Sequence, residues 1–245
     1  MERYSRHTVL KDIGEEGQDL ISKSKVVIIG LGGLGSTMAD TLVRCGVGEI
    51  LMVDRDVTEL SNLQRQTIYT EDDIGVPKAE VIRERMQKIN SNISIKAEIL
   101  DVDQSNIEDI IHHGDVVLDA TDNMDTRYII NDACVKHEKP WIFTAILGTY
   151  GMTLNIIPNK GPCLRCLMPE KPDDIKTGDT EGILFSIPRL MATIASTEAI
   201  KLLTQTEPRK ELLTIDLWKN EYDMTMISRP QGCPCCGKQD YEYLE

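Results

Sequence analysis

The stretch Lys25-Val-Val-Ile-Ile-Gly-Leu-Gly-Gly-Leu-Gly35 decides the fold. Its first five residues are mostly apolar and β-branched, which predicts a buried strand. Gly30, Gly32 and Gly35 then fit the pattern G-x-G-x-x-G, and helical periodicity follows over residues 36–44. In a strand–turn–helix of this kind, the glycines let backbone N–H groups and the helix N-terminus approach a phosphate. The stretch therefore predicts a nucleotide-binding turn in a Rossmann-like α/β fold.

The rest of the first half repeats this alternation of strands and helices. Short apolar runs predict four further strands, at 49–53, 93–99, 115–119 and 141–145. Helical periodicity predicts a helix over 78–89, between the first two of these strands. Strands and helices at this spacing predict a mostly parallel sheet with helices on both faces.

The second half is less regular and indicates a mixed β/α portion. Residues 149–157 predict a strand, and the polar segment 168–182, which contains two prolines and two glycines, predicts a mobile loop. The apolar helix predicted over 189–203 is either an ordinary core helix or one that packs across a subunit interface. A chain of 245 residues suits a single domain, 1–245.

Composition and charge exclude several classes of function. The chain carries 27 Lys and Arg against 40 Asp and Glu, a net charge of −13, and only 4% aromatic residues. A broad nucleic-acid surface is therefore not expected, although a small basic pocket for phosphates is compatible with these values. No apolar run approaches the roughly 18–20 residues that span a bilayer, and the first residues lack a signal-peptide pattern. We expect a cytoplasmic protein that binds neither nucleic acid nor membrane.

Seven cysteines in such a chain favour metal binding over disulfides. Cys163 and Cys166 form one C-x-x-C pair, and Cys233 and Cys236 form a second. Two such pairs predict a closed, tetrahedral zinc site with a structural role, and a redox pair is the alternative. Three cysteines are left over: Cys45, Cys134 and Cys235.

Charged residues at the predicted strand ends suit a nucleotide. Asp54 closes a strand 19 residues after Gly35, where a carboxylate can accept a hydrogen bond from a ribose hydroxyl. Arg65, Lys78 and Asp122 also follow strand ends or begin helices, and this combination suits Mg²⁺ and a triphosphate. Taken singly, each is more often a solvated side chain, and Asp122 could instead cap a helix over residues 123–135.

Seven features in one order carry a resemblance to a known family. They are Arg3-Tyr-Ser-Arg6, the glycine turn, Asp54, Ser61-Asn-Leu-Gln-Arg-Gln66, Gly75 with Lys78, Asp119-Ala-Thr-Asp-Asn123 followed by Arg127, and the two cysteine pairs. In this order the chain resembles the MoeB/ThiF/HesA family, the prokaryotic relatives of ubiquitin-activating enzymes. The resemblance extends from Arg3 to Gly237.

The resemblance implies an adenylyltransferase that uses ATP and Mg²⁺. Such an enzyme adenylates the C-terminal Gly-Gly carboxylate of a small ubiquitin-fold sulfur-carrier protein and releases pyrophosphate. A separate sulfur donor, a sulfurtransferase or a cysteine desulfurase, then acts on the product. Residues 1–24 would form an N-terminal helical arm, 25–147 the nucleotide-binding half, and 148–245 the carrier-binding half with the mobile loop 168–182 and the zinc site.

The resemblance also implies the roles of particular residues. Arg6, Arg65, Lys78 and Asp122 would be catalytic; Asp122 would hold Mg²⁺, and Arg6 would reach across a homodimer into the neighbouring site. The residues implied to bind the nucleotide are Gly30, Gly32, Gly33, Gly35, Asp54, Asn62, Arg65, Lys78, Asp122 and Asn123.

Two departures from the family pattern leave questions open. No cysteine occurs from residue 167 to 231, so the loop lacks the nucleophile that some members use, and Thr177 and Ser186 receive no role. Where the family has a glycine-rich stretch after the loop, this chain reads Gly182-Ile-Leu-Phe-Ser-Ile-Pro188. Which carrier and pathway are served (thiamine, molybdopterin or tRNA thiolation) stays open.

Other classes of function also remain. The first alternative is adenylation of a peptide or small-molecule carboxylate, and the second is a non-catalytic, nucleotide-binding regulatory subunit. An NAD-dependent oxidoreductase would need a substrate domain, and none fits after the glycine turn. Cys134 and Cys235 could accept sulfur, but buried structural thiols are the favoured interpretation.

Overall fold

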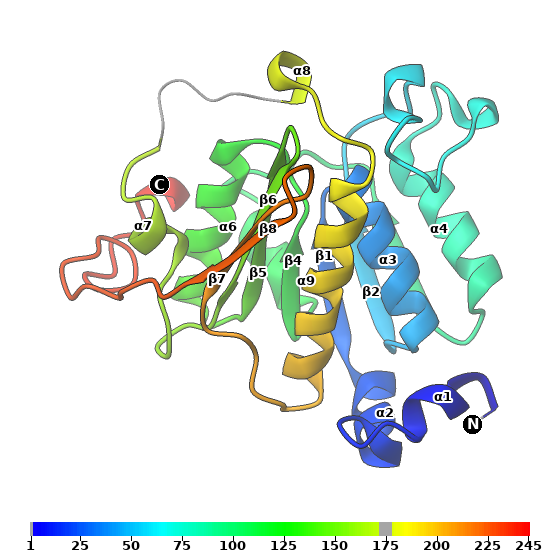
Figure 1. Ribbon diagram of the computed structural model, residues 1–245, viewed down its shortest axis with the longest axis horizontal. Coiled ribbons are helices and arrows are strands. Elements are labelled where there is room, and N and C mark those ends of the chain that lie inside the picture. The colour runs from blue at the N-terminus through cyan, green and yellow to red at the C-terminus, as the bar shows by residue number, and fades with distance from the viewer. Residues whose placement is uncertain (1, 172–177) are drawn as a thin grey trace.

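The computed structural model describes residues 2–171 and 178–245. One eight-stranded sheet runs through it, in the order β3-β2-β1-β4-β5-β6-β7-β8 (Figure 1). Strands β1 to β5 are parallel, and β6, β7 and β8 are added by antiparallel pairing. The strands are β1 (Lys25–Ile29), β2 (Glu49–Val53), β3 (Ser94–Glu98), β4 (Val116–Asp119), β5 (Trp141–Leu147), β6 (Tyr150–Ile156), β7 (Leu212–Asp216) and β8 (Glu221–Thr225).

Helices cover both faces of the sheet, as the sequence predicts. One face packs against α3 (Gly33–Cys45), α4 (Lys78–Ile89) and α9 (Ile187–Leu203), and the other against α5 (Ile107–His112), α6 (Met124–Lys136) and α7 (Leu164–Leu167). The remaining helices are α1 (Ser5–Thr8), α2 (Gly14–Lys23) and α8 (Gly178–Glu181), with 3-10 turns η1 (Glu2–Tyr4), η2 (Leu60–Asn62), η3 (Glu71–Asp73) and η4 (Glu242–Leu244).

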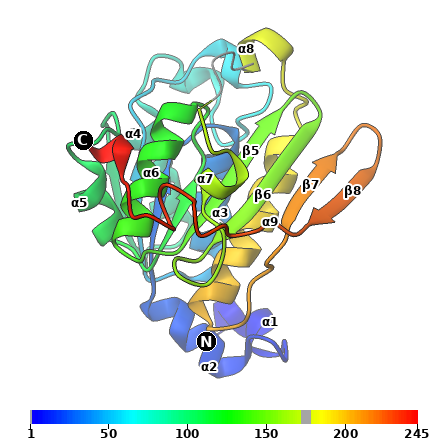
Figure 2. The same ribbon diagram turned by 90° about the vertical axis from the view of Figure 1, so that its left-hand side faces the viewer.

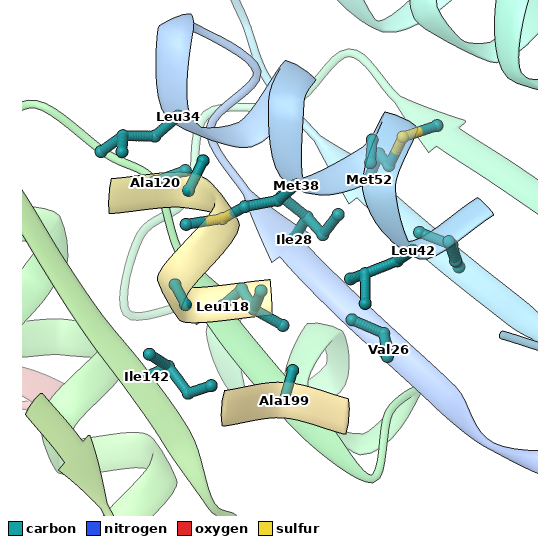
Figure 3. Packing of buried hydrophobic residues seen from close by; sticks show 14 of the residues in the cluster. Val26, Ile28, Leu34, Met38, Leu42, Met52, Leu118, Ala120, Ile142 and Ala199 are labelled. Carbon is teal, nitrogen blue, oxygen red and sulfur yellow. The ribbon is translucent and has the colours of Figure 1, made fainter. Parts of the chain in front are cut away.

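Alternating side chains of the central strands fill two separate cores. On β1, Val26 and Ile28 belong to the cluster under α3 and α9, whereas Val27 and Ile29 belong to the cluster under α5 and α6. Figure 3 shows the first cluster, where Met38 of α3 lies beside Ile28. Burial on both faces explains why these strands read as unbroken apolar runs. Each fully buried side chain of this size contributes about 1.5–3 kcal/mol.

Helix α9 is the longest helix of the described part of the chain, and it packs across α3, β5 and β6. Met191, Ala195 and Ala199 lie in the same core cluster as α3. The interpretation as a core helix is therefore confirmed for this inner face. No helix within residues 2–171 and 178–245 combines the length and apolar character needed to cross a membrane.

Most of the predicted elements lie within two residues of those observed. Helix α3 is the exception, since it begins at Gly33 rather than near Ser36. The first turn contains two glycines, which have low helix propensity and mask its start in the sequence. The predicted loop 168–182 is described only at its two ends, of which the second contains α8; residues 172–177 lie outside the described residues.

Candidate active site

The glycine turn lies where the sheet changes its direction of growth. From β1, strands β2 and β3 are added on one side, and β4 and β5 on the other. Open α/β sheets bind ligands in the crevice outside the strand ends at such a point. Gly30 follows β1 with a φ of 90°, and a Cβ there would lie 2.6 Å from the carbonyl oxygen of Ala120, which follows β4.

Close packing explains the glycines that follow. A Cβ on Gly35 would lie 1.8 Å from the carbonyl oxygen of Gly30, so only glycine allows α3 to approach β1 this closely. Gly32 is the N-cap of α3, and no side chain caps that helix. The N-terminus of a 13-residue helix therefore faces the crevice with its positive dipole end, an arrangement that favours phosphate.

Asp54 lies against the glycine turn, at the end of β2. One carboxylate oxygen accepts a hydrogen bond from the Leu31 N–H at 2.5 Å, and the other accepts one from the Asp56 N–H at 2.7 Å. Burial raises the pKa of Asp54, and the Lys78 ammonium counteracts this shift. The carboxylate is thus held rigidly where a ribose hydroxyl would meet a nucleotide bound at the turn.

Lys78 supplies a buried cation beside Asp54. It is the first residue of α4, and its backbone N–H donates to the Asp56 carbonyl at 2.9 Å. The side chain is 6% exposed, and its Nζ lies 3.1 Å from the Asp56 carboxylate, which is itself largely exposed. Its only ion pair in the described part of the chain is therefore with a solvated partner, so this ammonium can also serve phosphate oxygens.

The segment around η2 lies beside the turn, with the Arg65 carbonyl oxygen 3.5 Å from the position that a Cβ on Gly33 would take. Asn62 is buried, and its Oδ1 accepts from the Glu59 N–H at 3.2 Å. Arg65 is half-buried and donates to the Ser61 carbonyl at 3.0 Å. Both residues therefore have local partners that hold this segment in place.

Gln66 is a residue of this segment that sequence reasoning passed over. It is 4% exposed, and its Nε2 lies 3.4 Å from the position that a Cβ on Gly32 would take. Within the described residues its Oε1 has no hydrogen-bond partner. Because an unpaired buried acceptor costs about 1–3 kcal/mol, this atom fits a site that a ligand or water completes. The sequence did offer one indication of its role, because Gln66 is the last residue of the motif Ser61-Asn-Leu-Gln-Arg-Gln66.

Asp122 and Asn123 follow β4 and immediately precede α6. Asn123 caps the helix, since its Oδ1 accepts from the Thr126 N–H at 2.9 Å. The capping role that Asp122 could have filled therefore belongs to Asn123. Asp122 is exposed, and it has no hydrogen-bond partner among the residues that the structure describes. Its carboxylate is free to bind a cation at the strand edge.

Arg55 is a second residue that received no role from the sequence. Its guanidinium lies 2.6 Å from Asp101. Hydrogen bonding and charge from Asp101 raise the pKa of Arg55, and the charge of Asp122 adds to the effect. Arg55 thus links the ends of β2 and β3 and lies near the exposed carboxylate of Asp122.

Arg127, by contrast, is structural. It is buried, its Nε lies 3.2 Å from an Asp119 carboxylate oxygen, and its guanidinium lies 5.5 Å from the centre of the Phe143 ring. Removing either partner of a buried pair leaves an uncompensated charge, so the pair is costly to break. It ties α6 to the end of β4 and so positions residues 121–123.

Arg6 lies far from all these residues within one chain. It is exposed on α1, at the end of the molecule opposite the crevice (Figure 1). The structure therefore brings Asp54 and Lys78 to the glycine turn, places the backbone of Arg65 and Thr121 within 3.5 Å of the Cβ positions of Gly33 and Gly30, and leaves Arg6 at the far end of the molecule.

The unusual segment 182–188 borders the site. The Leu184 N–H donates to the Gly148 carbonyl at 2.8 Å, and Gln64 Nε2 donates to the Ile183 carbonyl at 3.1 Å. A Cβ on Gly33 would lie 3.0 Å from the Cβ of Pro188, so this proline packs against the glycine turn. The segment thus connects the β5–β6 hairpin with the segment that contains Asn62 and Arg65.

The two cysteine pairs meet in one cluster, next to α7. The four Sγ atoms all lie within 4.8 Å of one another, with Cys163 3.8 Å from Cys166 and 3.6 Å from Cys233, and Cys166 3.4 Å from Cys236. Tetrahedral zinc with bonds of about 2.3 Å would separate its sulfur ligands by about 3.8 Å. These four thiols fit a closed zinc site.

Two of the remaining cysteines are buried structural thiols, as the favoured interpretation holds. Cys134 and Cys235 are both 0% exposed. Burial raises the pKa of Cys134, so the thiol stays protonated at neutral pH. Asn131 donates a hydrogen bond to the Cys235 sulfur at 3.2 Å.

Known proteins resemble this chain over almost its whole length. A family model, described as the ThiF family, matches residues 4–235. The sulfur carrier protein ThiS adenylyltransferase of Bacillus subtilis is 41% identical over 99% of this chain and 73% of its own length. The SAMP-activating enzyme E1 of Haloferax volcanii is 37% identical over 100% of this chain and 94% of its own length.

Solved structures show the same fold. The crystal structure of E. coli MccB with ATP has a TM-score of 0.85 and 26% sequence identity, and the match covers 97% of this chain and 75% of that chain. A crystal structure of MccB with MccA-N7isoASN has a TM-score of 0.86. The sequence motifs, the fold and these matches agree, and the chain belongs to the ThiF family.

Proposed function

We propose that this adenylyltransferase activates the C-terminal Gly-Gly carboxylate of a small ubiquitin-like sulfur carrier. Two relatives that are 41% and 38% identical are named as sulfur carrier protein ThiS adenylyltransferases, and one that is 37% identical as a SAMP-activating enzyme E1, whereas MccB is 26% identical. The observation that carries the proposal is the arrangement at the glycine turn: the N-terminus of α3, which no side chain caps, lies together with the carboxylate of Asp54 and the buried cation of Lys78. This arrangement suits a nucleoside triphosphate.

The proposed reaction needs alignment and positive charge more than it needs a base. A C-terminal carboxylate is already ionised at pH 7. One of its oxygens attacks the α-phosphorus of ATP, the bond from that phosphorus to the bridging oxygen breaks, and pyrophosphate leaves. Lys78, Arg65 and the α3 N-terminus would hold the phosphates and offset the developing charge. When bound at Asp122, Mg²⁺ would neutralise phosphate oxygens.

The two halves of the chain would divide the work. Residues 25–147 carry the side chains that we propose bind the nucleotide, and we propose that residues 148–245 bind the carrier protein. Sulfur would come from a separate donor protein. Zinc would be held by the four-cysteine cluster, which joins α7 to the C-terminal segment (Figure 2). Because the cluster is closed and offers four ligands, we give it a structural role.

ATP–pyrophosphate exchange tests the proposed function. With Mg²⁺ and B. subtilis ThiS as the carrier, we expect exchange that depends on the carrier. Truncating ThiS by its last two residues should reduce exchange to the level without carrier, because the acceptor carboxylate is then misplaced. Exchange that is equal with both forms of ThiS would overturn the Gly-Gly assignment. ATP binding without any exchange would favour a peptide or small-molecule carboxylate, or a regulatory subunit.

Mixing two inactive variants tests a composite site in a homodimer. Arg6 lies at the opposite end of its own chain from the crevice, so we propose that it acts on the phosphates bound by a partner subunit. Arg6→Ala and Asp122→Ala should each be inactive alone. After subunit exchange at equal concentration, about a quarter of the parental activity should return in total, because about half of the dimers are mixed and one of the two sites in each mixed dimer is intact. Failure to recover any activity in a verified mixed dimer would contradict action across the interface.

A further inference from the structure

Tyr69 contacts the glycine turn from the interior of the protein. Its side chain is 4% exposed, and its hydroxyl donates a hydrogen bond of 2.8 Å to the carbonyl oxygen of Leu31, a fully buried residue. Burial raises the pKa of Tyr69, and the charge of Asp54 raises it further, so the hydroxyl keeps its proton and remains a donor at neutral pH. A tyrosine from the segment that follows η2 is therefore bonded to the backbone in the middle of the turn.

This hydrogen bond orients the peptide group between Leu31 and Gly32. A trans peptide is planar, with its N–H and C=O on opposite sides, and no peptide bond among the described residues is cis. Because the Leu31 carbonyl points inward to Tyr69, the Gly32 N–H points the opposite way. Gly32 is half-buried, whereas Leu31 is fully buried, so this N–H lies on the side of the turn that a ligand can approach. The preceding peptide is fixed separately, since the Leu31 N–H donates to Asp54 at 2.5 Å.

A glycine at position 32 does not fix this orientation by itself. Gly32 has a φ of −70°, and rotating the Leu31–Gly32 peptide would require a positive φ, which glycine adopts about as readily. The rotated peptide would present a carbonyl oxygen, which repels phosphate, in place of the N–H group that attracts it. It would also leave the buried Tyr69 hydroxyl without its acceptor, which costs free energy. The Tyr69 hydrogen bond therefore disfavours the orientation that opposes phosphate binding.

We propose that Tyr69 is a positioning residue for phosphate binding: its hydroxyl holds the Leu31 carbonyl inward and so presents the Gly32 N–H to the phosphate oxygens of the nucleotide. Gly32 is the N-cap of α3, where a helix has N–H groups without partners inside the helix and a positive dipole end. The group recognised there is therefore the phosphate chain, and neither the base nor the ribose. The inference rests on the proposed function only in requiring that ATP binds at the glycine turn.

Tyr69→Phe tests this role, because it removes the hydroxyl and keeps the ring. The affinities of the whole enzyme for ATP with Mg²⁺ and for adenosine are measured by calorimetry and ligand-observed NMR. The Kd of ATP should rise about tenfold, the loss typical of one hydrogen bond to a charged group, while the Kd of adenosine, which has no phosphate, should change less than about twofold. Replacing Tyr69 with 4-aminophenylalanine, which keeps a donor at the same position, should restore most of the affinity for ATP.

Tyr128→Phe is the matched control. Tyr128 is also buried, and its hydroxyl also donates to backbone carbonyl oxygens, those of Met168 and Glu170, each at 2.9 Å. Both variants lose a comparable hydrogen bond, so thermal unfolding should show a similar loss of stability, but only Tyr69→Phe should weaken the binding of ATP. An equal loss of ATP affinity in both folded variants, or an equal loss for ATP and adenosine in Tyr69→Phe, would show a merely structural role and overturn the inference.

A second measurement uses the parental enzyme and so does not depend on the folding of a variant. Labelling leucine carbonyls with ¹³C and glycine amides with ¹⁵N selects Leu–Gly peptides, of which Leu31–Gly32 is one. ATP should shift the NMR resonance of the Gly32 amide, and adenosine should leave it nearly unchanged. A Gly32 amide that does not shift in the ATP-bound enzyme would contradict the inference.

Carrier-dependent ATP–pyrophosphate exchange separates this inference from the proposed function. Exchange is measured on the same parental enzyme with B. subtilis ThiS and other Gly-Gly carriers. ATP binding that shifts Gly32 and depends on the Tyr69 hydroxyl, without exchange for any carrier, would remove the proposed function and leave the role of Tyr69 in place. Exchange that is accompanied by unchanged ATP affinity in the folded Tyr69→Phe variant would do the reverse.

Discussion

Carrier-dependent ATP–pyrophosphate exchange is expected to fall at least about a hundredfold when Asp122 is replaced by alanine. Losing a metal-holding carboxylate removes several kcal/mol of charge stabilisation from the transition state, and each 1.4 kcal/mol is worth about tenfold in rate. Asp122 is exposed, and Asn123 rather than Asp122 caps α6. The substitution should therefore leave the midpoint of thermal unfolding within about 1–2 °C of the parent.

Asp109→Ala is the matched control for this experiment. Asp109 is also an exposed aspartate close to a helix N-terminus, in the first turn of α5, and it has no proposed role in the site. Its removal changes the net charge by the same amount and should leave exchange unchanged. Raising the Mg²⁺ concentration should not restore the Asp122 variant to the parental rate. Exchange near the parental rate in a folded Asp122→Ala variant would show that the metal is held elsewhere.

Cys163→Ser is expected to have the largest effect on stability. Cys163 is 1% exposed and lies within hydrogen-bonding distance of two other thiols of the cluster. A structural zinc site contributes folding free energy directly, and losing about 4 kcal/mol lowers the unfolding midpoint of a chain of this size by about 10 °C. Metal analysis should find about one zinc per chain in the parent and much less in the variant.

The control is Cys45→Ser, which removes a partly buried thiol outside the cluster. It should retain its zinc and unfold within a few degrees of the parent. A chelator applied to the parent should reproduce the loss seen in the Cys163 variant, because both remove the same ion. A Cys163→Ser variant that holds no zinc and yet unfolds at the parental temperature would refute a structural role.

The parallel half of the fold could be predicted well from the sequence. Its strands are buried on both faces, so β1 and β2 stand out as continuous apolar runs with the boundaries that are observed. The glycine turn could be predicted for a similar reason, since a close approach such as that of Gly35 to the Gly30 carbonyl admits no side chain. Strong physical constraints leave clear patterns.

The antiparallel edge could not be predicted with the same success. All five residues of β8 are exposed, so no buried face imposes a pattern on them, and β8 was missed. The neighbouring strand β7 was missed as well, although three of its five residues are buried. Helix α5 was missed as well, because six residues span fewer than two turns and show little periodicity. Elements that are short or exposed show no clear hydrophobic periodicity from which they could be predicted.

In the candidate site, residues at the ends of predicted strands and helices were easier to identify than residues whose role depends on tertiary contacts. Asp54 and Lys78 follow or begin regular elements, and their meeting could be expected from the edge of the sheet. Gln66 and Arg55 acquire their significance only from neighbours such as Gly32 and Asp101, which the fold brings to them. Arg6 is the extreme case, since its proposed partner groups belong to another subunit.

The cysteine cluster also has a consequence for how this chain can diverge. Cys163 and Cys233, 70 positions apart, are joined at the cluster, which makes the intervening chain a closed loop. The entropy of closing a loop grows only with the logarithm of its length, so ten added residues cost about 0.1 kcal/mol. Insertions within residues 168–182 should therefore cost little free energy through loop closure, and orthologues can be longer in this stretch without losing the fold.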